Sequence, residues 1–251
     1  MNDPHVSALV YRLKHTATVT CDKAAPLEYE NTDFKVTIKN LDARFEMKGH
    51  FETAEKARNV VEPVIREWEF ATSLNQGPGE FELIFSDAVI EDRNPTPGVI
   101  SVRTGSMVMV GDSVSIVMGR GKYPEPPKGI ALNADVEAMA LRYSRYRESK
   151  DTLAGMAYFC LTVLEQAAGG RPAIPAMFGV AASIVTALGR LTGKKGGFEA
   201  RKGKGRPHEF TGEERNWIEQ AVKRLIWRAA EVAHDPASAQ TQITMANLPK
   251  L

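Results

Sequence analysis

The chain has 251 residues, of which 43% are hydrophobic and 25% charged, and its formal net charge is +1. This composition is ordinary for a soluble globular protein, and the length predicts two domains at about 150 residues each. The two cysteines, Cys21 and Cys160, exclude a disulfide framework and zinc-ligand spacing, so we expect a cytoplasmic protein without a metal or cofactor. The most apolar run, 153–164, is shorter than the roughly 20 residues that cross a bilayer, so we expect neither a transmembrane helix there nor a membrane partner.

The charges are distributed unevenly along the chain. Residues 1–120 contain 13 Lys and Arg against 18 Asp and Glu, whereas residues 121–251 contain 19 against 13. A polyanion would therefore bind the second half. Electrostatic attraction between an acidic and a basic half explains the asymmetry equally well.

Alternation of apolar and polar residues predicts a mixed, mostly antiparallel β domain over residues 1–120. One helix, expected over 53–70, has an apolar stripe that would pack across the sheet, and Pro63 should bend it or leave a carbonyl unpaired. Asn40 to Asp42 form a predicted turn. Strands are expected over 6–20, 34–40, 43–49, 80–92, 99–104, 106–110 and 113–118.

The second half has helical periodicity instead. A Pro- and Gly-rich segment, 121–129, predicts an extended and poorly packed connector between the domains. An α-helical bundle is expected over 130–236, followed by an arm, 237–251, that lies on this bundle or on a neighbouring chain. The bundle helices are expected over 134–149, 152–167, 174–191 and 211–233. The fold class is therefore predicted to be α+β, in two domains.

The last of these helices has clear start and stop signals. Thr211 and Glu214 have the spacing of a capping box, in which each side chain accepts a hydrogen bond from the other residue's backbone amide. Asp235 precedes Pro236, which disfavours a helical conformation at the residue before it. The sequence thus predicts one long amphipathic helix ending near His234.

Two basic stretches suggest contact with nucleic acid. A glycine-rich segment between the third and fourth bundle helices contains the cations Lys194, Lys195, Arg201, Lys202, Lys204 and Arg206. Such a segment suits phosphate neutralisation, or is simply a solvated surface loop. In the second stretch, basic residues alternate with aromatic residues: Arg142, Tyr143, Arg145, Tyr146 and Arg147. Its tyrosines would stack on RNA bases or pack inside the bundle while the arginines remain solvated.

Residues 134–236 resemble HEPN-domain proteins. The resemblance lies in RYRESKDTLAGMAYFCLTVLE (145–165), the basic segment, and RAAEVAH (228–234) on the final helix. It implies an all-helical bundle with an Arg-x(4–6)-His motif, which in many family members belongs to a dimeric, metal-independent ribonuclease. Arg228 matches the family arginine and His234 the family histidine. Ala229 departs from the pattern, because active members often have a polar residue there.

The helical geometry complicates a shared site. Arg228 and His234 point about 120° apart on a straight helix, and Glu231 lies between them, within reach of either. A site would need the long reach of Arg228, a loosened helix end, or a second chain. His234 would then serve as general acid or base and Arg228 would stabilise the phosphorane charge. Alternatively, Arg228 and Glu231 form a surface ion pair and His234 interacts with the helix C-terminus.

The preferred interpretation is RNA binding or metal-independent RNA cleavage by the second domain, with catalytic residues Arg228, His234 and Glu231. A defence or toxin-like setting and a homodimer are implied by the HEPN resemblance. One alternative is a non-catalytic, homo-oligomeric assembly module. Another is a sensor that holds a small ligand in its β domain and dimerises through its bundle. RNA cleavage without metal would separate the first interpretation from both alternatives.

Overall fold

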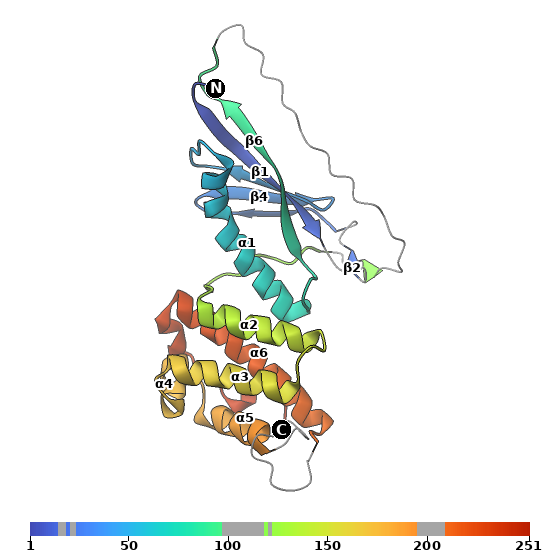
Figure 1. Cartoon of the computed structure of the whole chain (residues 1–251), viewed down its shortest axis with the longest axis vertical. Helices are drawn as coiled ribbons and strands as arrows, with labels where there is room; N and C mark the ends of the chain where they lie inside the picture. The colour runs from blue at the N-terminus through green and yellow to red at the C-terminus, as the bar shows by residue number, and fades with distance from the viewer. Residues whose placement is uncertain (15–18, 21–23, 97–117, 120–121, 195–208) are drawn as a thin grey trace. The chain divides into compact units, whose positions relative to one another are not determined.

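The computed structural model describes residues 1–14, 19–20, 24–96, 118–119, 122–194 and 209–251. The chain forms two compact units, Met1–Pro126 and Pro127–Leu251 (Figure 1). The predicted strands 99–104 and 106–110 lie outside the described residues, as does 113–118 except for Met118. Among the described residues, no helix is both long enough and apolar enough to span a membrane.

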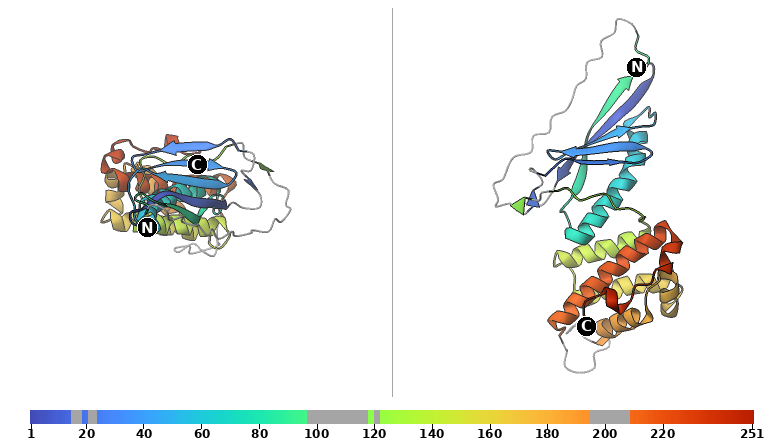
Figure 2. Two further views of the ribbon diagram at one scale, coloured as in Figure 1. Left: turned by 90° about the horizontal axis from the view of Figure 1, so that it is seen from above. Right: turned by 180° about the vertical axis from the view of Figure 1, so that it is seen from behind.

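The first unit is built on a five-stranded sheet in the order β3-β4-β5-β1-β6, and every neighbouring pair is antiparallel (Figure 2). Its strands are β1 (Pro4–Lys14), β3 (Leu27–Glu30), β4 (Phe34–Lys39), β5 (Asp42–Met47) and β6 (Glu82–Asp92). A parallel pair, β2 (Val19–Thr20) with β7 (Met118–Gly119), forms a second sheet. The predicted strand 6–20 is thus two strands, and β3 was not predicted.

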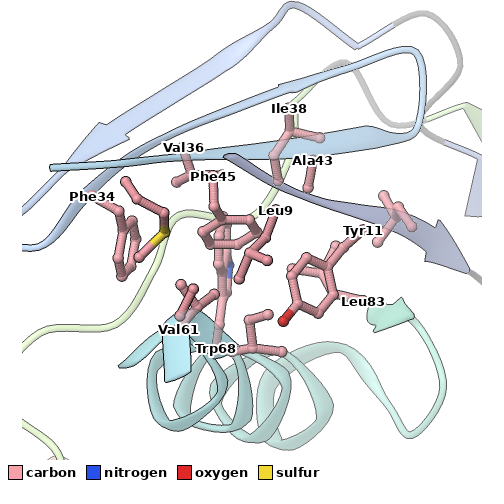
Figure 3. Packing of buried hydrophobic residues seen from close by; sticks show 14 of the residues in the cluster. Leu9, Tyr11, Phe34, Val36, Ile38, Ala43, Phe45, Val61, Trp68 and Leu83 are labelled. Carbon is pink, nitrogen blue, oxygen red and sulfur yellow. The ribbon is translucent and has the colours of Figure 1, made fainter. Parts of the chain in front are cut away.

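One face of the sheet is apolar and the other is charged. Residues 34, 36 and 38 of β4 and residues 43, 45 and 47 of β5 are buried, while the residues between them are more exposed. Helix α1 (Ala54–Gln76) covers the apolar face. Figure 3 shows Trp68 and Val61 projecting from α1 toward Leu9 and Phe45 of the sheet. Together with the helix, this sheet confirms the α+β class.

Helix α1 continues past the predicted end at residue 70. Thr53 caps its N-terminus by accepting a hydrogen bond from the Lys56 amide, and Gly77 follows its last turn. Residues 70–72 and Leu74 are buried, so the apolar stripe continues and favours further helical turns. The helix also runs through Pro63 without ending there.

The first half of the predicted connector is packed rather than loose. Tyr123 is only 4% exposed and belongs to the core of the first unit. Its hydroxyl accepts a hydrogen bond from the Leu41 amide at 3.4 Å. The Trp68 indole N–H donates to the Pro124 carbonyl at 3.1 Å. These contacts anchor residues 122–126 to the β unit, so the prediction of poor packing is wrong for this stretch.

The second unit is a helical bundle. Its helices are α2 (Ala134–Arg147), α3 (Leu153–Ala167), α4 (Ile174–Phe178), α5 (Ala182–Lys194) and α6 (Gly212–His234). Helix α3 is buried along most of its length. The predicted capping box of α6 is confirmed, because Thr211 and Glu214 exchange both hydrogen bonds.

The predicted helix 174–191 is broken in the structure. A 3-10 turn, η1 (Arg171–Ala173), leads into the short α4, and Gly179 then adopts a left-handed conformation with φ 59°. After the break, Val180 pairs in parallel with Ile243 of the C-terminal arm. The break is thus a left-handed glycine cap with the arm paired beside it, and local helical periodicity does not reveal this partner.

Candidate functional site at the end of α6 and on the α2–α6 surface

Arg228, the arginine of the HEPN-like motif, lies in the interior of the bundle. The residue is 3% exposed. Its Nε lies 2.9 Å from Glu231 Oε2, one turn further along α6. Its Nη1 donates a hydrogen bond of 2.5 Å to the Ser238 carbonyl. The expected Arg228–Glu231 ion pair is thus present, but it is not on the surface, since the arm covers it.

Local sequence explains how the arm reaches the arginine. Asp235 ends α6 in an extended conformation, and its carboxylate accepts a hydrogen bond from the Ala237 amide. This cap starts a 3-10 turn, η3 (Pro236–Gln240), which turns back against α6. The Ser238 carbonyl then meets Arg228. A buried guanidinium needs such partners, because an unpaired buried charge is strongly unfavourable.

His234 lies apart from this buried pair. It is the last residue of α6 and is exposed, whereas Arg228 is buried. Within the described part of the chain, the side chain of His234 makes no hydrogen bond or ion pair. The structure therefore joins Arg228 to Glu231 and leaves His234 on the surface. In this conformation the guanidinium is engaged by Glu231 and by the arm, so it is not free to contact a phosphate.

The arm is held at a second point, beside Gly179. The Ile243 amide donates to the Gly179 carbonyl at 2.7 Å, and the Ala181 amide donates to the Ile243 carbonyl at 2.8 Å. Ile243 is 3% exposed. A Cβ atom on Gly179 would lie only 2.0 Å from the carbonyl oxygen of Ala239. Of the two placements predicted for residues 237–251, the structure shows the arm on its own bundle.

Replacing Gly179 with alanine should destabilise the helical unit by at least about 2 kcal/mol. Alanine pays a conformational cost at the left-handed φ of 59°, and its methyl group would displace the Ala239 carbonyl. Urea unfolding would measure the loss, and hydrogen exchange at the Ile243 amide would show whether the arm opens. Gly193→Ala is the matched control, because its Cβ would meet nothing within 4 Å. Equal stability of both variants would contradict tight packing of the arm.

Little of the basic segment can be placed. Lys194 is the last residue of α5. The other five predicted nucleic-acid-binding residues, Lys195, Arg201, Lys202, Lys204 and Arg206, lie outside the described residues. Their phosphate-binding role stays a prediction from the sequence.

A second polar cluster lies where α2 packs on α6, and we call it the α2–α6 patch. The Glu219 carboxylate accepts hydrogen bonds from the hydroxyls of Tyr143 and Tyr146, each at 3.4 Å. Arg147 Nη1 lies 3.8 Å from Glu219 Oε1. The members of the patch are Tyr143, Tyr146, Arg147, Arg215, Glu219 and Lys223.

The two tyrosines of the patch differ in exposure. Tyr143 is 2% exposed, whereas the Tyr146 ring is half-buried. Their ring centroids are 6.3 Å apart with an interplanar angle of 52°. Burial is the main cause that raises the pKa of both hydroxyls, and the Glu219 charge adds to it. Both phenols are therefore neutral donors at pH 7, and Tyr146 alone presents part of its ring to solvent.

The cations of the patch repel one another. Burial lowers the pKa of Lys223, and the positive charge of Arg147 lowers it further, against the opposing effect of Glu219. Arg215 lies close enough to Tyr146 for its charge to lower the pKa of that phenol. Arg147 and Lys223 thus lie near the one carboxylate of the patch, and Arg215 lies near Tyr146. With three cations and one carboxylate, the patch has a net positive charge.

The interleaved arginines of α2 have different roles. Arg142 is paired with Asp151, and its guanidinium carbon lies 5.4 Å from the ring centroid of Phe159. Arg145 is exposed. Only Arg147 joins the tyrosines in the patch. The sequence reasoning missed Arg215, Glu219 and Lys223, although their spacing of four residues along α6 places them on one face of the helix.

Comparisons with protein-family models, with curated proteins and with solved structures found no match to this chain. These comparisons therefore neither support nor oppose the HEPN resemblance. Within the described ranges, no group of three or more His, Cys, Asp or Glu side chains could hold a metal ion.

Proposed function

We propose that the helical unit binds single-stranded RNA through the α2–α6 patch. The observation that carries this proposal is the gathering of Tyr146, Arg147 and Lys223 from two neighbouring helices around one carboxylate. Proteins that bind single strands combine cations that contact the phosphates with aromatic rings on which bases stack. The patch supplies both kinds of side chain.

Electrostatics supports an anionic ligand. Burial lowers the pKa of Lys223, and the charge of Arg147 lowers it further against the opposing effect of Glu219, so the two cations repel each other in the free protein. A phosphate placed between them would relieve this repulsion and release bound counterions. The surplus of Lys and Arg in residues 121–251 favours the approach of a polyanion to this unit. The basic segment from Lys194 to Arg206 would extend the contact.

The buried position of Arg228 favours binding over cleavage. In the HEPN-like hypothesis, Arg228 and His234 act on the same phosphodiester, but the guanidinium is engaged by Glu231 and Ser238. Cleavage by this pair would require the arm to leave Arg228, whether the protein acts as one chain or as a homodimer. A cytoplasmic location, where RNA is available, is part of the same proposal.

Tyr146→Ala should weaken binding of a single-stranded RNA by about 1–3 kcal/mol, the usual contribution of one stacked base. Fluorescence anisotropy with a labelled, unstructured RNA of mixed sequence would measure the change. Leu141→Ala is the matched control, because Leu141 lies on the same helix, is 64% exposed and is not part of the patch. Equal affinities for both variants would contradict stacking on Tyr146, and the absence of binding by the parent protein would contradict the proposed function.

A further inference from the structure

Glu219 is an unusual member of a surface that binds phosphates. A carboxylate repels a phosphate, yet this one stands at the centre of the patch, between the two tyrosine hydroxyls and Arg147. Its side chain is 28% exposed. In a complex with RNA, Glu219 must therefore contact a part of the nucleotide other than the phosphate.

The hydrogen-bonding capacity of Glu219 is not used up. Hydrogen bonds between oxygens are usually about 2.7–2.8 Å long, whereas both tyrosine contacts are 3.4 Å. The contact with Arg147 is longer still, at 3.8 Å. A carboxylate has about four lone-pair positions on its two oxygens. Glu219 can thus accept two shorter hydrogen bonds from a ligand that has parallel N–H donors.

The bases differ in whether they can offer such a pair. Guanine has N1–H and N2–H side by side on its Watson–Crick edge, which matches the two oxygens of a carboxylate. Adenine and cytosine each have one amino group beside a ring nitrogen acceptor. The N3–H of uracil lies between two carbonyl oxygens, which a carboxylate would repel. Proteins read the Watson–Crick edges of unpaired RNA bases in this way.

We infer that Glu219 makes the α2–α6 patch selective for guanine in single-stranded RNA, an inference that rests on the proposed function. The guanine Watson–Crick edge donates N1–H and N2–H to the two Glu219 oxygens. The Tyr146 ring stacks on the base or on its neighbour. Arg147 and Lys223 contact the flanking phosphates. Glu219 is thus a specificity-determining residue rather than a source of affinity for the RNA backbone.

Substitution of inosine for guanosine tests this inference on the unmodified protein. Inosine lacks only the 2-amino group, so it removes one of the two donors and leaves the backbone unchanged. With a short, unstructured RNA in which guanosines alternate with adenosines, the inosine version should bind the full-length parent protein about tenfold more weakly, in the range for loss of a base-specific contact. Fluorescence anisotropy at one fixed salt concentration gives both affinities.

Glu219→Gln should bring the ratio of the two affinities close to one, because an amide has a single acceptor oxygen. Glu213→Gln removes the same charge from an exposed position on the same helix and should keep the parent's ratio. If the parent protein binds both RNAs equally, the inference is overturned while RNA binding stands. If it binds neither RNA, the proposed function fails as well. Even if Glu219→Gln does not fold, the ratio of the parent protein's affinities for the guanosine and inosine RNAs tests the inference.

Discussion

Arg228→Ala is expected to lower the free energy of unfolding by about 3 kcal/mol. Removing one partner of a buried ion pair costs about 3–5 kcal/mol, because the remaining charge is left without a partner. The lower end applies here because the Glu231 side chain is 23% exposed and can recover some hydration. The Ser238 carbonyl would lose its donor as well. The arm should then be less firmly held.

Urea unfolding followed by circular dichroism would measure this loss. Arg224→Ala is the matched control, because Arg224 lies on the same helix and is exposed, so its replacement should change stability by less than about 0.5 kcal/mol. A small loss for Arg228→Ala would show that its guanidinium is solvated, as in a surface ion pair. The catalytic hypothesis makes a different prediction, in which Arg228→Ala abolishes RNA cleavage and leaves the melting temperature close to that of the parent protein.

Elements whose signals are local were predicted well. The capping box of α6 depends on two side chains three residues apart, and both of its hydrogen bonds are present. Strands β4 and β5 follow from alternation across a two-residue turn, where Asn40 and Leu41 have positive φ angles. Each of these features is determined within a few residues, so the sequence alone reveals it.

Features that depend on distant partners were not predicted. Strand β3 has only four residues and is recognised by its pairing with β4. The break at Gly179 accommodates Ile243, which pairs beside it from the distant arm. Arg228 is buried because the arm, ten residues later in the chain, returns to it. Helical periodicity describes each helix separately and cannot show which segment will cover it.

The residues of the candidate site also divide into those with a local sequence signal and those that depend on distant partners. The alternation of Arg and Tyr on α2 suggested either a surface for RNA or tyrosines packed inside the bundle, and Tyr143 is buried. The alternation did not separate Arg147 from Arg142, which pairs with Asp151. Glu219 and Lys223 carry no motif of their own. They become part of a site only because α6 packs beside α2 and brings them to the tyrosines. Packing between helices, rather than spacing within one helix, creates the patch.

Neutralising Arg147 and Lys223 together should weaken RNA binding by roughly tenfold or more at low salt. Each cation that contacts a phosphate releases counterions on binding, so the loss should be largest at low ionic strength and shrink as salt is added. The double variant Arg147→Gln, Lys223→Gln keeps hydrogen-bonding capacity and removes both charges. Arg190→Gln with Arg224→Gln is the matched control, because it removes two charges from exposed positions outside the patch.

The salt dependence of RNA binding tests the central claim most directly. The affinity of the full-length protein for a single-stranded RNA would be measured from about 50 to 200 mM salt, the range in which phosphate contacts have large effects. If the α2–α6 patch binds the phosphates, the parent protein gives a steep linear decline of log affinity against log salt. Each phosphate contact on a single strand contributes about 0.7 to this slope. The double variant, which loses the two contacts of Arg147 and Lys223, should therefore give a slope shallower by about 1.4. Binding with the same slope and affinity in both proteins, or no binding by the parent protein, would contradict the proposal.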